Sequence, residues 1–139
     1  MYIVIVGGGG VGFHLSQKLL SYGHKVTVIE KRLKTIEELK LKLPEVEIIE
    51  GDGSKLEILR RSGLDKADLL ILLTGIDERN LSIGLLAKNE FKVPRVVSRV
   101  NDPKHEWLFD KHLGIDNAIN RAALMVDELT KILKSTESN

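Results

Sequence analysis

The residues with the clearest chemical potential form a glycine-rich turn near the start of the chain. An apolar run with β-strand composition, residues 2–6, leads into a helical pattern through Gly7-Gly8-Gly9-Gly10-Val11-Gly12. Gly7, Gly9 and Gly12 have G-x-G-x-x-G spacing, which after a strand and before a helix predicts a phosphate-binding turn. Gly7 would take the tight turn, Gly9 would let a pyrophosphate approach, and Gly12 would let the helix pack on the sheet. Free N–H groups of the first helical turn would bind the phosphates.

A turn without a ligand is the alternative interpretation. A structural turn needs only one or two glycines. Each glycine in a regular element costs roughly 0.5–1 kcal/mol relative to Ala, because it loses more backbone entropy on folding. The four consecutive glycines 7–10 therefore favour nucleotide binding.

An acidic residue follows at the distance expected for a ribose acceptor. Glu30 ends the β-branched run 25–30. In the dinucleotide-binding fingerprint, an acid about twenty positions beyond the turn accepts hydrogen bonds from the adenosine ribose hydroxyls. A carboxylate repels a 2′-phosphate, so Glu30 favours NAD(H) or an adenine mononucleotide over NADP(H). Lys31 and Arg32 weaken this preference, because a neighbouring cation could meet a 2′-phosphate.

Composition indicates one cytoplasmic globular domain. The chain has 139 residues, 42% of them hydrophobic, which suffices for a core of ordinary size. The formal net charge of +1 predicts no nucleic-acid partner, and the lack of cysteine excludes a disulfide framework. No apolar run approaches the ~20 residues of a membrane span, and the start of the chain has the pattern of a strand rather than of a leader.

Strand-like and helix-like segments alternate along the chain. This alternation predicts an α/β fold of Rossmann type, a doubly wound parallel six-stranded sheet of order 3-2-1-4-5-6 with helices on both faces. We expect strands at 2–6, 25–30, 46–50, 68–73, 95–99 and 117–119. We expect helices at 11–22, 34–43, 55–62, 79–91, 103–113 and 121–134. Residues 1–134 would form the domain, and 135–139 a frayed polar tail.

The ordered set of motifs resembles one family, the RCK N-terminal (TrkA-N or KTN) nucleotide-binding domain of potassium transport regulatory proteins. The resemblance covers nearly the whole chain. Single motifs are unspecific, but their order is specific. Besides the glycine turn it rests on Gly23-His24, Glu30-Lys31, Ile49-Glu50-Gly51-Asp52-Gly53, Ala67-Asp68, Thr74-Gly75-Ile76-Asp77-Glu78-Arg79-Asn80-Leu81, Leu86-Ala87-Lys88, Val93-Pro94-Arg95 and Ser98-Arg99-Val100-Asn101-Asp102-Pro103.

The resemblance implies a domain that binds NAD(H), ATP or ADP as a signal and performs no chemistry on it. It implies that Asp52, with Gly51 and Gly53, lies beside the adenine. The residues alone allow two interpretations of Asp52. One is a carboxylate at the carboxyl edge of a parallel sheet, where ligands bind; the other is simple turn chemistry with a helix cap.

Further residues are implied by the same resemblance. Thr74 and Gly75 would line the inner phosphate and ribose end, and Asn80 would tether the Thr74 loop to its helix. Arg99 would face the cleft and reach a phosphate or a second subunit. By its position alone, Arg99 is equally consistent with a solvated strand end.

Gly10 is the one departure from the family pattern. Members that sense ATP usually carry a basic residue between the second and third glycines of the turn. Without that cation a γ-phosphate loses a charge-assisted partner, of order 1.5–3 kcal/mol. Gly10 therefore favours NAD(H), or ADP or AMP, over ATP, which stays among the possible ligands.

Catalysis is not expected. A small NAD-dependent oxidoreductase would need a second lobe for its substrate and an acid–base group at the nicotinamide. The four histidines have no metal-ligand spacing, so neither a catalytic nor a metal site is predicted. A nucleotide or redox sensor for an unrelated partner would share the fold physics and stays open.

The partners implied by the resemblance are a second copy of the chain, in a homodimer or ring-like oligomer, and a membrane potassium transporter or channel. The protein would then be cytoplasmic and peripherally associated with that transporter. The helix at 121–134 has more apolar surface than one side of a terminal helix needs, and we expect it to cross to a neighbouring subunit. Its apolar residues are Ala122, Ala123, Met125, Val126, Leu129, Ile132 and Leu133.

Overall fold

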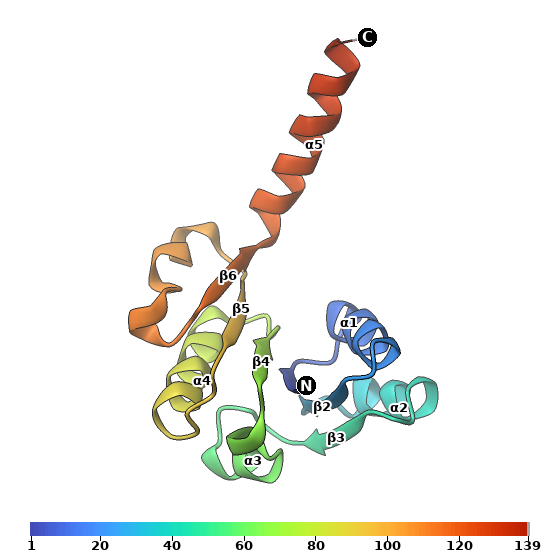
Figure 1. Ribbon diagram of the computed structural model, residues 1–139, viewed down its shortest axis with the longest axis vertical. Coiled ribbons are helices and arrows are strands. Elements are labelled where there is room, and N and C mark those ends of the chain that lie inside the picture. The colour runs from blue at the N-terminus through green and yellow to red at the C-terminus, as the bar shows by residue number, and fades with distance from the viewer. Residues whose placement is uncertain (139) are drawn as a thin grey trace.

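The computed structural model describes residues 1–138 and contains one parallel sheet of six strands (Figure 1). The spatial order is β3-β2-β1-β4-β5-β6, so the predicted fold class and strand order are confirmed. Every neighbouring pair of strands is parallel. The strands are β1 (Tyr2–Val6), β2 (Lys25–Glu30), β3 (Glu47–Glu50), β4 (Leu69–Leu72), β5 (Val96–Val100) and β6 (Asn117–Asn120).

Helices cover both faces of this sheet. Alternate residues of β1 serve the two faces: Ile3 and Ile5 pack in the core under α1 and α2, whereas Val4 and Val6 pack in the core under α3 and α4. Burial on both faces explains why the strands are nearly continuous apolar runs. The helices are α1 (Gly10–Ser21), α2 (Leu33–Lys42), α3 (Leu56–Arg61), α4 (Asp77–Asn89) and α5 (Arg121–Glu137), with a short 3₁₀ helix η1 at Leu64–Lys66.

The helix predicted at 103–113 is wrong. Two 3₁₀ helices replace it, η2 (Pro103–Leu108) and η3 (Lys111–Leu113). Asp110 between them has extended backbone, and its carboxylate accepts hydrogen bonds from the N–H groups of His112 and Leu113. An aspartate that satisfies nearby backbone donors in this way competes with a continuing α-helix.

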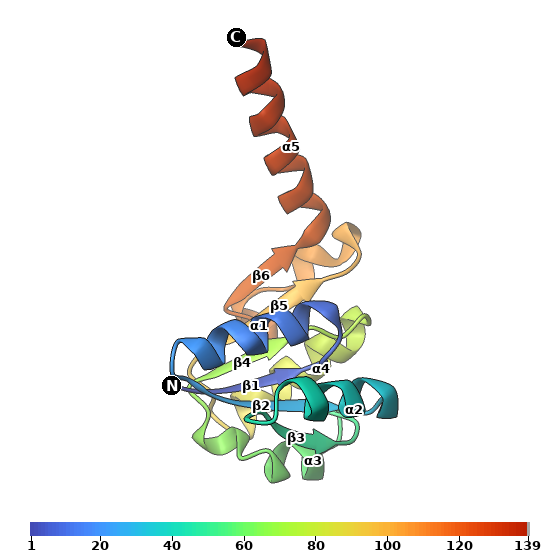
Figure 2. The same ribbon diagram turned by 90° about the vertical axis from the view of Figure 1, so that its right-hand side faces the viewer.

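The last helix is longer than predicted and projects away from the sheet (Figures 1 and 2). Residues 135–137, predicted as part of a frayed tail, continue α5, whereas Asn139 lies outside the described residues. Nothing in α5 is buried, and its large apolar side chains are 54–62% exposed: Leu124, Met125, Val126, Leu129, Ile132 and Leu133. Within residues 1–138, no helix combines the length and apolar character that crossing a membrane requires.

The topology places several loops at one edge of the sheet. The strand order reverses between β1 and its neighbour β4, and in doubly wound sheets ligands bind beyond the carboxyl ends of the strands at this point. The glycine turn follows β1, Glu30 ends β2, and Thr74 follows β4. Three of the predicted site segments therefore meet at the switch point.

Candidate nucleotide-binding site

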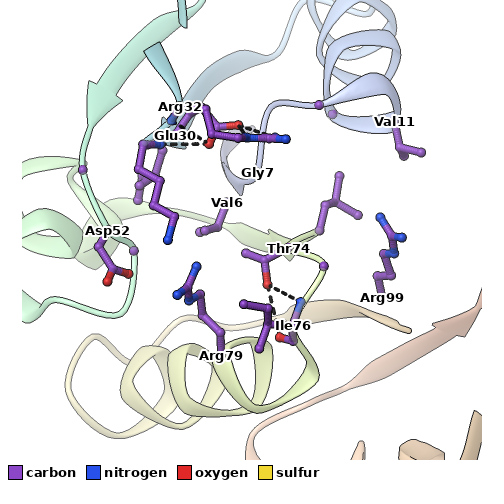
Figure 3. A pocket seen from close by; sticks show the side chains of 18 of the residues that line it. Val6, Gly7, Val11, Glu30, Arg32, Asp52, Thr74, Ile76, Arg79 and Arg99 are labelled. Atoms are coloured by element: carbon purple, nitrogen blue, oxygen red, sulfur yellow. Dashed lines mark hydrogen bonds and ion pairs between the residues drawn. The ribbon is translucent and has the colours of Figure 1, made fainter. Parts of the chain in front are cut away.

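A cavity of about 420 Å³ opens at the carboxyl edge of the sheet (Figure 3). Its wall brings together most of the predicted site residues: Gly7, Gly9, Gly10, Val11, Gly12, Glu30, Lys31, Gly51, Asp52, Gly53, Thr74, Gly75 and Arg99. Gly8 and Asn80 do not line it. Two further residues lie in the cavity wall: Arg32, expected from the sequence only as a cation that could meet a 2′-phosphate, and Arg79, which was not expected at the site.

The glycine turn has the geometry that its sequence predicts. Gly7 has a φ of 104°, which side chains disfavour, and a Cβ on Gly12 would lie 2.2 Å from the carbonyl oxygen of Gly7. In contrast, no atom comes within 4 Å of the place where a Cβ on Gly10 would lie. The first hydrogen bond of α1 runs from Phe13 N–H to Gly9 O, so the three preceding N–H groups have no intrahelical acceptor. These three residues line the cavity, and free N–H groups at a helix N-terminus are a favourable environment for an anion.

Gly8 lies behind the turn rather than in the cavity. A Cβ there would lie 2.7 Å from the Leu39 side chain of α2. Its N–H group donates to Oε1 of Glu30 at 3.2 Å. Gly8 therefore holds the acidic residue by a backbone hydrogen bond and lies outside the wall of this cavity.

Glu30 is buried, with 5% of its surface exposed, and its carboxylate is densely hydrogen-bonded. Besides Gly8, the N–H groups of Lys31 and Arg32 and the Arg32 guanidinium donate to it. Burial alone would raise the pKa of Glu30, but the hydrogen bonds from Arg32, Lys31 and Gly8 outweigh it and hold the pKa below its usual range. Glu30 is thus an ionised group at the end of β2.

Asp52 combines both interpretations drawn from the sequence. It lines the cavity (Figure 3), and it also closes a turn by accepting hydrogen bonds from the N–H and the hydroxyl of Ser54, at 2.9 and 2.7 Å. These bonds lower the pKa of Asp52, and the charges of Arg79 and Lys31 lower it further. This turn follows β3 and holds the Asp52 carboxylate in the part of the cavity wall that residues 51–53 form.

Two side-chain amides, the buried Asn80 and the partly buried Asn101, hold the Thr74 loop at the cavity. The Thr74 hydroxyl donates to Oδ1 of Asn80 at 2.6 Å, and Nδ2 of Asn80 donates back to the Thr74 carbonyl at 3.0 Å and to the Arg99 carbonyl at 3.3 Å. Asn80 is thus a tether, as its predicted role requires. Asn101, which was not predicted, donates from Nδ2 to the same Thr74 carbonyl at 3.0 Å.

Arg99 lies across the cavity from Asp52 (Figure 3). Its Nε is buried, and within residues 1–138 it has no hydrogen-bond partner. Burial lowers the pKa of Arg99, and the charge of Arg121 lowers it further. The wall holds four cations, Lys31, Arg32, Arg79 and Arg99, against the anions Glu30 and Asp52, an excess that suits a ligand with phosphates.

The sheet order, the glycine turn and the acidic end of β2 together define a Rossmann-type domain of the nucleotide-binding class. The sequence model of the TrkA-N domain family matches residues 3–121 of this chain. The chain therefore belongs to the TrkA-N family. This confirms the resemblance noted in the sequence.

The similar curated proteins are named as potassium uptake proteins. Trk system potassium uptake protein TrkA of Mycobacterium tuberculosis is 37% identical over 125 residues, which cover 90% of this chain and 56% of that protein. The Trk system potassium uptake protein TrkA homolog of Methanothermobacter thermautotrophicus is 35% identical over 133 residues, covering 96% and 60%. The chain therefore spans somewhat more than half the length of these relatives.

Solved structures share the fold at lower identity. The TrkA-N domain of inner membrane protein ybaL from Escherichia coli has a TM-score of 0.83 at 24% identity, covering 95% of this chain and 96% of that one. The Kef CTD of Shewanella denitrificans in AMP bound form has a TM-score of 0.77 at 20% identity, covering 100% and 83%. The GsuK channel bound to NAD has a TM-score of 0.75 at 19% identity, covering 85% and 21%.

Proposed function

We propose that this domain binds NAD(H) or an adenine nucleotide as a regulatory signal and controls a potassium uptake transporter or channel. The observation that carries the proposal is the meeting of three groups in one cavity: the open N-terminus of α1, the acidic end of β2 and Asp52 beyond β3. Phosphate, ribose and base of one ligand would each face a chemically matched group. The role in potassium uptake rests on the names of the relatives.

NAD(H) is the ligand we favour, with ADP and AMP next and ATP last. The open space at Gly10 leaves a γ-phosphate without the cation expected there in ATP-sensing relatives. The names of the structural neighbours, one bound to NAD and one to AMP, support this range of ligands. The excess of cations around the cavity favours the phosphates that all of them share.

Regulation rather than turnover is supported by the cavity wall. Its two carboxylates are already hydrogen-bonded, Glu30 to Arg32 and Asp52 to Ser54, and its one hydroxyl, that of Thr74, is bonded to Asn80. Incubation with NADH or ATP should therefore leave the nucleotide intact. The uncovered apolar side chains of α5 support a homo-oligomer. Its place at the cytoplasmic side of a membrane transporter is proposed from the potassium uptake names of the relatives.

Calorimetric titration with NADH, NAD, ADP, AMP and ATP tests the proposal, with thermal unfolding as a second readout. A ligand at 100 times its Kd should stabilise the fold by about 2.7 kcal/mol. Arg60→Ala, an exposed substitution outside the cavity, should bind like the wild type. Absence of both heat and stabilisation with all five nucleotides at millimolar concentration would refute nucleotide binding.

A further inference from the structure

The carboxylate of Glu30 has no free acceptor site in this structure. A carboxylate offers about four lone-pair positions. Oε1 accepts from Gly8 N–H at 3.2 Å and from Nε and Nη2 of Arg32 at 3.1 and 2.6 Å, while Oε2 accepts from the N–H groups of Lys31 and Arg32 at 2.8 and 3.4 Å. A ribose hydroxyl can therefore bond to Glu30 only if the Arg32 side chain moves away.

The Arg32 guanidinium lies between the ribose acceptor and the phosphate turn. Its Nη2 is 3.2 Å from the place where a Cβ on Gly9 would lie, and Figure 3 shows the side chain beside Glu30 along the turn. The side chain is 60% exposed, in contrast to the buried carboxylate that it contacts. Two of its five N–H donors face Glu30, so three remain for a ligand.

Charge at this end of the cavity is opposite to what Glu30 alone would give. The ion pair of Glu30 and Arg32 is neutral as a unit, and Lys31 beside it also lines the cavity. The ribose end thus carries one net positive charge, where the isolated acid would supply one negative charge. A guanidinium with free donors is well suited to a phosphate, because its fork matches two phosphate oxygens.

We propose that Arg32 sets ligand specificity at the ribose end: while paired with Glu30 it presents a cationic face that accepts a 2′-phosphate. The cavity then binds 2′-phosphorylated adenine nucleotides, the class of NADP(H), at least as tightly as their unphosphorylated counterparts. This rests on the proposed nucleotide binding and reverses the preference expected from Glu30 alone.

Two probes that differ only in the 2′-phosphate test the assignment: 5′-AMP and adenosine 2′,5′-bisphosphate, each titrated calorimetrically. The wild-type chain should bind the bisphosphate at least as tightly as AMP. Arg32→Ala should weaken the bisphosphate by about tenfold or more, because the bare carboxylate repels it. The same variant should bind AMP more tightly, because the ribose hydroxyls gain Glu30 as an acceptor.

Two further variants sharpen the result. Arg32→Lys keeps the positive charge but removes the paired N–H donors of the guanidinium, and it should retain bisphosphate binding to within about threefold. Arg60→Ala removes an exposed arginine outside the cavity and should change neither ligand. Thermal unfolding of each variant identifies any loss of the fold. If Arg32→Ala unfolds, the comparison of the two ligands on the wild-type chain carries the test.

The outcomes separate the two proposals. If AMP binds the wild type and the bisphosphate binds about tenfold more weakly or not at all, the role of Arg32 is overturned while nucleotide binding stands. Equal weakening of both ligands by Arg32→Ala also overturns it. If neither probe binds, and NADH and ADP do not bind either, nucleotide binding and the Arg32 assignment fall together.

Discussion

At the residue scale, Gly12 is the site position that tolerates a side chain least, because a Cβ there would lie 2.2 Å from the Gly7 carbonyl oxygen. Its missing side chain lets the first turn of α1 rest on the Gly7 carbonyl, which aims the free N–H groups of the helix at the cavity. Gly10, two positions earlier, has open space around it. A side chain would therefore fit at Gly10 but not at Gly12, although both positions belong to the same glycine-rich turn.

Gly12→Ala should destabilise the fold by about 1–3 kcal/mol or more, because a methyl group 2.2 Å from a backbone oxygen forces the turn to shift. Gly10→Ala is the matched control and should leave stability nearly unchanged. Denaturant unfolding of both variants measures the difference. Equal stability of the two variants would contradict the close approach of α1 to the turn.

Two kinds of site residue could be predicted from the sequence: glycines at positions where a side chain does not fit, and residues at the end of a strand. Site residues whose role depends on the conformation of a neighbouring side chain could not be predicted. Gly12 and Glu30 follow from spacing along a strand–turn–helix unit. The covering of Glu30 by Arg32 depends on a side-chain conformation that no spacing specifies. Arg79, which lines the cavity, lies in the first turn of α4, and this helix begins at Asp77, two residues before its predicted start.

At the element scale, the N-terminus of α4 joins the cavity floor to the 3₁₀ segment after β5. Asp77 in its first turn accepts from the N–H groups of Asn101 and Asp102, at 2.7 and 2.9 Å, and pairs with Nδ1 of His105 at 2.8 Å. Burial alone would raise the pKa of Asp77, but these hydrogen bonds hold it below its usual range. The bond to Asp77 raises the pKa of His105, and the charges of Asp102 and Glu78 act in the same direction.

The His105 contact should make stability depend on pH. Because the pKa of His105 is raised on folding, its contribution is fully present below the unfolded pKa and is lost as the pH rises through the folded pKa. His105→Gln should therefore destabilise the chain more at about pH 5.5 than at about pH 8.5. His112→Gln, at a side chain that is 94% exposed, is the control. A His105→Gln effect that is equal at both pH values would refute the charged pair.

The predicted bounds of a helix or strand are correct where the pattern of apolar residues and the turn residues that follow it indicate the same end point. β1 and β2 have the predicted bounds, because each is an apolar run ended by a glycine or a charged residue. The segment 103–113 failed although its start was correct: Asp102 caps it and Pro103 follows. The helical pattern in the sequence continues through Asp110, whereas in the structure the first 3₁₀ helix ends before Phe109 and the Asp110 carboxylate caps the second.

At the scale of the whole molecule, the sheet and α5 have different environments. The sheet is covered on both faces, whereas α5 extends from the edge strand β6 (Figure 2). The large apolar side chains of α5 are exposed. A helix with one apolar face and no core contact gains stability by covering that face. We expect a second copy of the chain to provide the cover.

Leu129→Asp combined with Leu133→Asp should convert the oligomer to a monomer, because burying one leucine contributes about 1.5–3 kcal/mol to association. The domain itself should keep its stability, since no residue of α5 is buried in the core. Lys131→Asp, which places a similar charge on the polar side of α5, should leave the oligomer intact. Light scattering measures the masses, and a wild-type monomer at high protein concentration would rule out this use of α5.

Amide NMR spectra recorded during titration with ADP or NADH test the central claim most directly, because they locate a ligand residue by residue. We predict saturable shifts at Gly9, Gly10 and Gly12 of the turn, at Asp52 and at Gly75, with little change on the outer face of α3. These positions surround the cavity at the carboxyl edge of the sheet. Unchanged amides there at millimolar nucleotide, or shifts confined to another surface, would contradict a nucleotide site in this cavity.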